Sequence, residues 1–263
     1  MKSNNYPIGI FDSGIGGTSI WKEISKLLPK ENCIYLSDSK NAPYGEKSKE
    51  EIIDLSIKNT EYLLSKNCKI IVVACNTATT NAIKILREKY KIPFIGIEPA
   101  IKPASLKTKT NVIGILATKG TLNSHLFEKT SNSISKQITI KETIGKGLVE
   151  LIEDGNIDSY EMEKLLLTYL IPMLNDGVDS LVLGCTHYPY LIPKIRKIVG
   201  NKIEIIDSGQ AVAKQTKAIL TKHTLLNVDE NYGKHQFYIN RNKQVLEKLI
   251  PINNNIKIDE GDF

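Results

Sequence analysis

Short apolar runs alternate with longer amphipathic stretches along most of this chain of 263 residues. The apolar runs have the length of single strands and no polar face, as buried parallel strands do. The stretches between them repeat apolar residues at helical spacing. This alternation predicts βαβ units and an α/β fold. The expected strands are 8–11, 34–36, 70–74, 94–97, 112–116, 138–143, 180–183 and 203–206, and the clearest expected helices are 49–65, 81–90 and 162–174.

A loose internal repeat divides the chain into two halves. Gly-Ile-Phe-Asp at 9–12 matches Gly-Ile-Leu-Ala at 114–117, and a cysteine follows each run at a similar distance. We therefore expect two similar doubly wound (Rossmann/flavodoxin-like) domains, with parallel sheets facing across an active-site cleft. The expected first domain is 1–98 plus 208–263, because a second Asp-Ser-Gly at 207–209 suggests a return to it. The expected second domain is 99–207, and the tail after about Asn227 is assigned to the first.

Two of the apolar runs end in a cysteine that is followed by a polar pair. Cys75 precedes Asn76 and Thr77, and Cys185 precedes Thr186 and His187. A polar pair after a buried strand can open the next helix. A thiol at such a junction lies near a helix N-terminus, where free N–H groups and the macrodipole favour the thiolate. Two cysteines in matching contexts predict a pair of thiols that face one substrate.

The other two cysteines and the overall composition exclude several classes of protein. Cys33 and Cys68 are interpreted as buried structural thiols, and no C-x-x-C spacing indicates a zinc site. The net charge of +6 comes from lysines spread along the chain, without a basic run between aromatics, so no nucleic-acid partner is predicted. No apolar stretch is long enough for a bilayer and the N-terminus has no signal region. We expect a cytoplasmic protein with no membrane partner.

Three further features allow both a functional and a structural interpretation. Asp12 and Ser13 precede a glycine-rich turn that can bring backbone N–H groups to an anion, or simply join a strand to a helix tightly. Its spacing is that of neither a dinucleotide-binding turn nor a P-loop. The loop at 37–48 contains Tyr44 and Gly45, and it either faces a ligand or covers the surface. His187 could hold a proton beside Cys185 or be a packed side chain.

Seven strings of residues together resemble the glutamate racemases, within the wider aspartate/glutamate racemase superfamily. The strings occur in the expected order between residues 8 and 209, and the two that contain the cysteines are the most specific. They read GIFDSGIGG, DSKNAPYG, VVACNTATT, FIGIEPAIKPA, LATKGT, LGCTHYPYL and IIDSG.

The resemblance implies an isomerase that interconverts L- and D-glutamate without pyridoxal phosphate, metal or any other cofactor. By carry-over of the motifs, Cys75 deprotonates D-glutamate with help from Asp12, and Cys185 deprotonates L-glutamate with help from His187. Glu153 corresponds to an acidic catalytic position of the family, although Gly-Lys-Gly-Leu at 145–148 replaces the usual Cys-Pro-Leu-Phe-like stretch before it. The implied substrate contacts are Asp12, Ser13, Tyr44, Gly45, Asn76, Thr77, Thr118, Thr186 and His187.

The same resemblance implies a cellular role and leaves alternatives open. D-glutamate would supply peptidoglycan biosynthesis, and so cell wall biogenesis and cell shape. The partner is then the small molecule glutamate, and a homodimer is compatible with the sequence. An aspartate racemase or a related thiol isomerase is the nearest alternative. A small-anion or nucleotide-binding module with merely buried cysteines is the non-enzymatic one.

Overall fold

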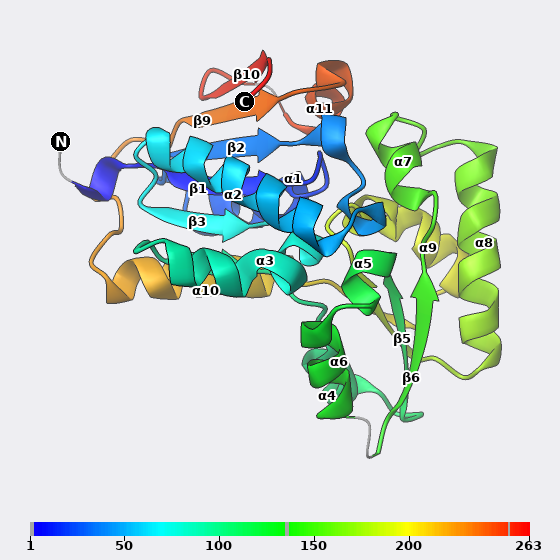
Figure 1. The fold of residues 1–263 in the computed structure, drawn as a ribbon. Helices are drawn as coiled ribbons and strands as arrows, with labels where there is room; N and C mark the ends of the chain where they lie inside the picture. Colours follow the sequence, from blue (N-terminus) through cyan, green and yellow to red (C-terminus); the bar gives the residue numbers. More distant parts are fainter. Residues whose placement is uncertain (1–2, 135–136, 252) are drawn as a thin grey trace.

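The structure is a computed structural model that describes residues 3–134, 137–251 and 253–263, and it contains two parallel β-sheets (Figure 1). Sheet A has the order β10-β9-β2-β1-β3-β4, and sheet B has the order β6-β5-β7-β8. The strands of sheet A are β1 (Ile8–Asp12), β2 (Cys33–Ser37), β3 (Ile70–Val73), β4 (Phe94–Gly96), β9 (His235–Ile239) and β10 (Ile256–Glu260). The strands of sheet B are β5 (Val112–Ala117), β6 (Thr139–Ile144), β7 (Ser180–Gly184) and β8 (Glu204–Ile206).

Helices cover both faces of sheet A because its central strands are apolar on both sides. Ile8 and Ile10 of β1 belong to the core beneath α1 and α10, whereas Phe11 packs into the core beneath α2 and α3. The helices from the N-terminus to the start of sheet B are α1 (Thr18–Leu27), α2 (Lys49–Ser65), α3 (Asn76–Lys89) and α4 (Ile101–Lys107), with the short η1 (Ser3–Asn5), η2 (Ser39–Asn41) and η3 (Tyr44–Glu46). The remainder are α5 (Lys119–Leu122), α6 (His125–Asn132), α7 (Leu148–Glu153), α8 (Tyr160–Asn175), η4 (Tyr188–Leu191), α9 (Ile192–Val199), α10 (Gly209–Lys222) and α11 (Lys243–Leu249).

The predicted fold class is confirmed, and so is the internal repeat. All eight predicted strands form, with ends shifted by a residue at most places. The order β2-β1-β3-β4 in sheet A recurs as β6-β5-β7-β8 in sheet B, so β1 and β5 hold equivalent central places. Two strands were not predicted: β9 and β10 extend sheet A at one edge. The predicted limits of the two domains remain a prediction, although sheet A takes its strands from residues 8–96 and 235–260 and sheet B from 112–206.

The two cysteine-containing junctions differ in local structure. Cys75 is the N-cap of α3, which begins at Asn76 and so starts earlier than the predicted helix at 81–90. Cys185 is followed by a turn and by the 3-10 helix η4, and α9 begins only at Ile192. The expectation that both cysteines sit at the start of an α-helix is therefore correct for Cys75 and wrong for Cys185. The proline at 189, inside the first turn of η4, is compatible with this short helix.

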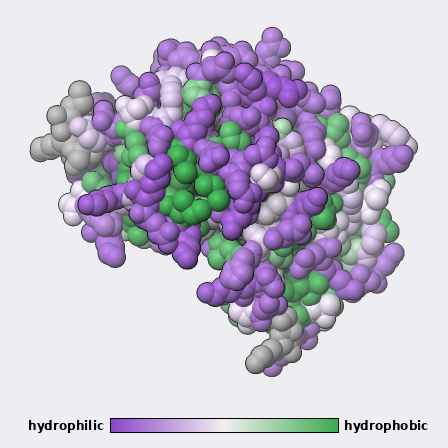
Figure 2. Space-filling view, in the orientation of Figure 1, coloured by the Kyte–Doolittle hydropathy of each residue, from purple (hydrophilic) through white to green (hydrophobic). Residues whose placement is uncertain are grey.

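The surface is mostly polar on the face that Figure 2 draws. Figure 2 shows a largely hydrophilic face that is broken by small hydrophobic areas. Within the described parts of the chain, no helix is both long and apolar enough to cross a membrane.

Candidate active site

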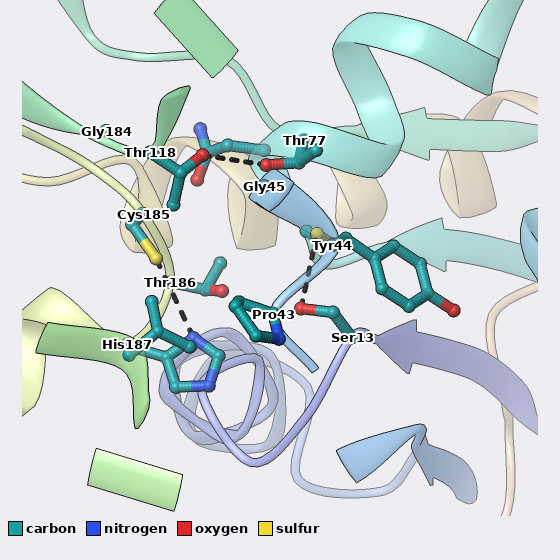
Figure 3. Close-up of a pocket in the computed structure, with 13 residues that line it drawn as sticks. Ser13, Pro43, Tyr44, Gly45, Thr77, Thr118, Gly184, Cys185, Thr186 and His187 are labelled. Atoms are coloured by element: carbon teal, nitrogen blue, oxygen red, sulfur yellow. Dashed lines mark hydrogen bonds between the residues drawn. The ribbon is translucent and has the colours of Figure 1, made fainter. Parts of the chain in front are cut away.

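A pocket lies between the carboxyl ends of the two sheets and receives residues from both (Figure 3). Its free volume is about 10 Å³, close to the minimum that one water molecule needs. The cleft is therefore nearly closed, and a substrate larger than water requires it to widen. The lining residues are Ser13, Pro43, Tyr44, Gly45, Cys75, Asn76, Thr77, Thr118, Val149, Gly184, Cys185, Thr186 and His187.

Cys75 stands at the end of β3 and is almost fully buried. Its Sγ donates to Ser13 Oγ at 3.6 Å and accepts from the Ala78 N–H at 3.4 Å. Burial raises the pKa of the Cys75 thiol strongly, and the negative charge of Asp12 raises it further. The Ala78 N–H and the Ser13 hydroxyl lower this pKa by less. The helix amide therefore favours the Cys75 thiolate as expected, but in this state of the cleft desolvation outweighs it.

Cys185 stands at the end of β7 and begins a chain of side-chain contacts. Its Sγ lies 3.7 Å from His187 Nδ1, and His187 Nε2 lies 2.6 Å from Glu153 Oε1 (Figure 3 shows the first contact). All three side chains are buried. Burial alone would lower the pKa of His187, but the hydrogen bonds to Cys185 and Glu153 outweigh it and hold this pKa well above its usual value. A protonated His187 can thus donate toward Cys185 and stabilise negative charge there.

The glycine-rich turn after β1 contacts His187 and Glu153 from the opposite side of the cleft. The Ile15 N–H donates to Glu153 Oε1 at 2.6 Å, and the Gly16 N–H donates to His187 Nε2 at 3.3 Å. A Cβ on Gly14 would meet Glu153 Oε1 at 1.9 Å, and one on Gly16 would meet the His187 ring at 2.2 Å. The glycines at 14 and 16 are therefore required by close approach to the His187–Glu153 pair.

Asp12 is fully buried behind the pocket and does not line it. Its Oδ2 accepts from the Gly17 N–H at 2.7 Å, and its Oδ1 accepts from the Thr186 hydroxyl at 3.4 Å. Burial raises the pKa of Asp12 from 3.8 to about 6, against the lowering effect of a charged His187. Asp12 thus acts on Cys75 through its charge, while its hydrogen bond reaches the residue next to Cys185.

Asn76 and a group of threonines supply neutral polar groups to the pocket. Both amide atoms of Asn76 are buried and have no hydrogen-bond partner among the described residues. Thr77 Oγ1 and Thr118 Oγ1 lie 2.8 Å apart across the cleft, and Thr121 Oγ1 lies within 3.3 Å of both (Figure 3 shows the first pair). A buried amide without partners is costly, so the free groups of Asn76 mark a place where a polar ligand fits.

Tyr44 and Gly45 line the pocket, but the Tyr44 hydroxyl is engaged elsewhere. It donates to Asp38 Oδ2 at 2.6 Å and accepts from Asn59 Nδ2 at 3.1 Å. Figure 3 shows the Tyr44 ring directed away from Cys185 and His187. Gly45 approaches Thr118 closely, since an added Cβ would lie 2.8 Å from the Thr118 Cβ.

Most of the site residues predicted from the sequence come together in this one pocket. Ten of them line it, whereas Asp12 and Glu153 support it from behind. Sequence reasoning missed Pro43, Val149 and Gly184, which also line the pocket. Their apolar or small side chains carry no signal of chemistry. Within residues 3–134, 137–251 and 253–263, no three or more His, Cys, Asp or Glu side chains form a group that could hold a metal ion.

The fold and the pocket together define an α/β protein whose cleft presents one thiol from each of two facing sheets. Cys75 and Cys185 are close enough for a charge on one to disfavour a charge on the other. Such a cleft can offer an acid–base group to each side of one small substrate. This arrangement suits an isomerase that works on both faces of one carbon atom.

Comparison with known proteins assigns the family. The chain belongs to the Asp/Glu/Hydantoin racemase family, whose model matches residues 8–216. It is 46% identical over 222 residues to a glutamate racemase of Cupriavidus pinatubonensis, covering 84% of this chain and 82% of the relative. It is 44% identical over 227 residues to a glutamate racemase of Ectopseudomonas mendocina, covering 86% of each.

Solved structures of glutamate racemases have the same fold. The glutamate racemase isoform RacE1 of Bacillus anthracis superposes with a TM-score of 0.86 at 31% identity, over 98% of each chain. The Francisella tularensis glutamate racemase in complex with D-glutamate gives a TM-score of 0.84 at 30% identity, again over 98% of each chain. The resemblance noted in the sequence and the prediction of an isomerase are confirmed.

Proposed function

We propose that this protein interconverts L- and D-glutamate by acid–base chemistry at Cys75 and Cys185. The observation that supports it most is the pair of thiols at the ends of β3 and β7, which line one pocket from opposite sheets. Relatives at 40–47% identity are named glutamate racemase, which favours glutamate as the substrate over aspartate. The substrate contacts predicted from the sequence, the domain limits, the supply of D-glutamate to peptidoglycan, the cytoplasmic location and a homodimer belong to the same proposal.

The chemistry requires a proton to leave one face of the α-carbon and another to arrive on the opposite face. A free thiol has a pKa of about 8.5, far below that of an α-proton, so a thiolate is a weak base for this task. The pocket must therefore stabilise the developing carbanion with fixed donors in a dry environment. The free amide of Asn76 and the hydroxyls of Thr77 and Thr186 are suited to hold the glutamate carboxylates.

The electrostatics of the two sides suit opposite roles at rest. Burial and Asp12 raise the pKa of Cys75, so this residue is a thiol that can deliver a proton. The high pKa of His187 keeps a positive charge beside Cys185, where it can stabilise a thiolate that removes a proton. In this state the cleft is ready for L-glutamate, with Cys185 as base and Cys75 as acid. The opposite protonation state accepts D-glutamate: here Asp12 has taken up the proton that Cys75 loses, so that its charge no longer opposes a Cys75 thiolate.

Chiral analysis of purified protein tests this function directly. Incubation with pure L-glutamate and no added cofactor should yield equal amounts of the two enantiomers, and L-aspartate in a parallel reaction should remain essentially unchanged. Matched reactions with Cys75→Ala serve as the control for a contaminating racemase. Absence of D-glutamate, or faster conversion of aspartate than of glutamate, would remove the proposal.

A further inference from the structure

A second cavity lies directly behind the His187–Glu153 pair. Its volume is about 70 Å³, and it shares Pro43 and Val149 with the active-site pocket. Glu153 and the buried Ser39 line it, and the exposed ion pair between Asp154 and Arg241 stands at its outer side. Figure 1 shows α7, which carries Glu153, beside the segment that follows β2. The cavity is roomy enough for water, which needs about 10–15 Å³ per molecule on this measure.

The contacts around His187 and Glu153 suit a proton that moves between them. Nε2 and Oε1 are 2.6 Å apart, so one proton can lie on either atom. When the proton is on His187, the carboxylate Oε1 keeps the N–H of Ile15 as a donor. When it is on Glu153, the bare Nε2 accepts from the N–H of Gly16. Each position of the proton therefore leaves the accepting atom, Oε1 or Nε2, with its own backbone donor.

The other oxygen of Glu153 has no partner of its own. Oε2 is buried and makes no hydrogen bond with any described residue. A buried carboxylate oxygen needs a donor, because burying it without a hydrogen bond is costly. Since Glu153 also lines the second cavity, water that enters this cavity can supply that donor.

We propose that the second cavity is a proton-exchange port through which Cys185 equilibrates with solvent by way of His187 and Glu153. The inference rests on the two-thiol function proposed above. After turnover from L-glutamate, Cys185 is a thiol that faces the His187 imidazolium. The imidazolium passes its Nε2 proton to Oε1 of Glu153 and from Glu153 to water, and the Cys185 thiol then transfers its proton to the neutral ring of His187. One thiol becomes a thiolate, one proton reaches the solvent, and no bond between heavy atoms changes.

A two-thiol racemase needs such a port because each turnover exchanges the protonation states of its cysteines. After L-glutamate becomes D-glutamate, Cys185 carries a proton and Cys75 has lost one. The enzyme must reset before it can accept L-glutamate again. With the cleft nearly closed, a route behind Glu153 lets the Cys185 side reset without passing through the substrate pocket.

Tracer perturbation measures this reset independently of the overall rate. Labelled racemic glutamate is brought to equilibrium with the enzyme, and a large excess of unlabelled L-glutamate is added. If the reset is slow, enzyme left in its D-binding form captures labelled D-glutamate, and the label drifts transiently toward the L-enantiomer. If the reset is fast, the label stays equally distributed.

Two variants at one position separate the cavity from the chemistry. Ser39→Leu fills the second cavity, whereas Ser39→Ala leaves it open and removes the same hydroxyl. We expect Ser39→Leu to shift the label toward the L-enantiomer well beyond the wild type, and Ser39→Ala to match the wild type. Glu153→Gln, which cannot pass on a proton, should produce the same drift and covers the case in which Ser39→Leu fails to fold.

The outcomes distinguish the port from the underlying function. An active Ser39→Leu or Glu153→Gln enzyme whose label stays as evenly distributed as in Ser39→Ala would overturn the port. A wild-type enzyme that does not racemise glutamate would instead remove the two-thiol function on which the port rests.

Discussion

The two sides of the cleft hold equivalent thiols in unlike surroundings. Cys75 caps a regular α-helix and has one side-chain partner among the described residues, the hydroxyl of Ser13. Cys185 precedes a 3-10 turn and continues into a buried chain through His187 to Glu153. The strand order of the two sheets is the same, so the repeat supplies the positions of the thiols while the loops after the strands set their chemistry.

The largest expected effect comes from removing either thiol. Cys75→Ala and Cys185→Ala should each lose at least the ~10²–10⁴-fold that general acid–base catalysis contributes, because each face of the substrate needs its own proton carrier. Steady-state racemisation from both enantiomers measures this loss, with Cys68→Ala as a control at a buried cysteine outside the pocket. If either variant keeps more than a few per cent of wild-type turnover, the cysteine that it lacks is not an essential proton carrier.

The next largest effect distinguishes the roles of His187 and Asp12, which support Cys185 and Cys75. His187→Asn breaks a direct contact with Cys185, whereas Asp12→Asn removes a charge near Cys75 without breaking a contact to that thiol. We expect His187→Asn to slow single turnover mainly from L-glutamate, Asp12→Asn to slow it mainly from D-glutamate, and the first loss to be the larger. The steady-state ratio of kcat/KM for the two directions cannot show this difference, because the equilibrium constant between the enantiomers fixes that ratio. Equal losses in both directions for both variants would remove the assignment of sides.

A smaller effect concerns stability, and it follows from the raised pKa of Asp12. This pKa is about 6 in the folded protein against an ordinary value of 3.8, so the folded state binds more protons between these values. The free energy of unfolding therefore falls as pH rises through this window. Asp12→Asn should stabilise the protein near neutral pH by up to about 3 kcal/mol and have little effect below about pH 4.

Urea unfolding of the wild type and of Asp12→Asn, near neutral pH and below about pH 4, checks whether the stabilisation appears only at the higher pH. Glu46→Gln, at an exposed carboxyl that does not line the active-site pocket, is a matched control for the loss of one charge. Equal stabilisation by Asp12→Asn at both pH values would mean that its effect does not come from titration of Asp12.

The sequence predicts which strand ends carry the reactive cysteines. It predicts less well the strands, backbone donors and apolar residues that surround these cysteines. Cys75 and Cys185 are evident because a polar residue interrupts an apolar strand at its end. Strand β10 is not evident, because an edge strand such as Ile-Lys-Ile-Asp-Glu keeps polar residues that face solvent. The N–H groups of Ile15 and Gly16 are equally hidden, since a backbone donor has no side-chain signature. Val149 looks like any core residue until the fold places it in the pocket.

Deuterium labelling tests the central claim of two separate thiols most directly. A thiol holds one transferable proton, so while the substrate is bound the cysteine that removes the α-hydrogen returns that same hydrogen. The opposite cysteine delivers a proton that exchanged with solvent before the substrate bound. In deuterated water, early D-glutamate formed from L-glutamate should carry deuterium while the remaining L-glutamate carries almost none, and the converse should hold from D-glutamate. Deuterium that enters the recovered substrate as fast as the product would contradict two isolated thiols at Cys75 and Cys185.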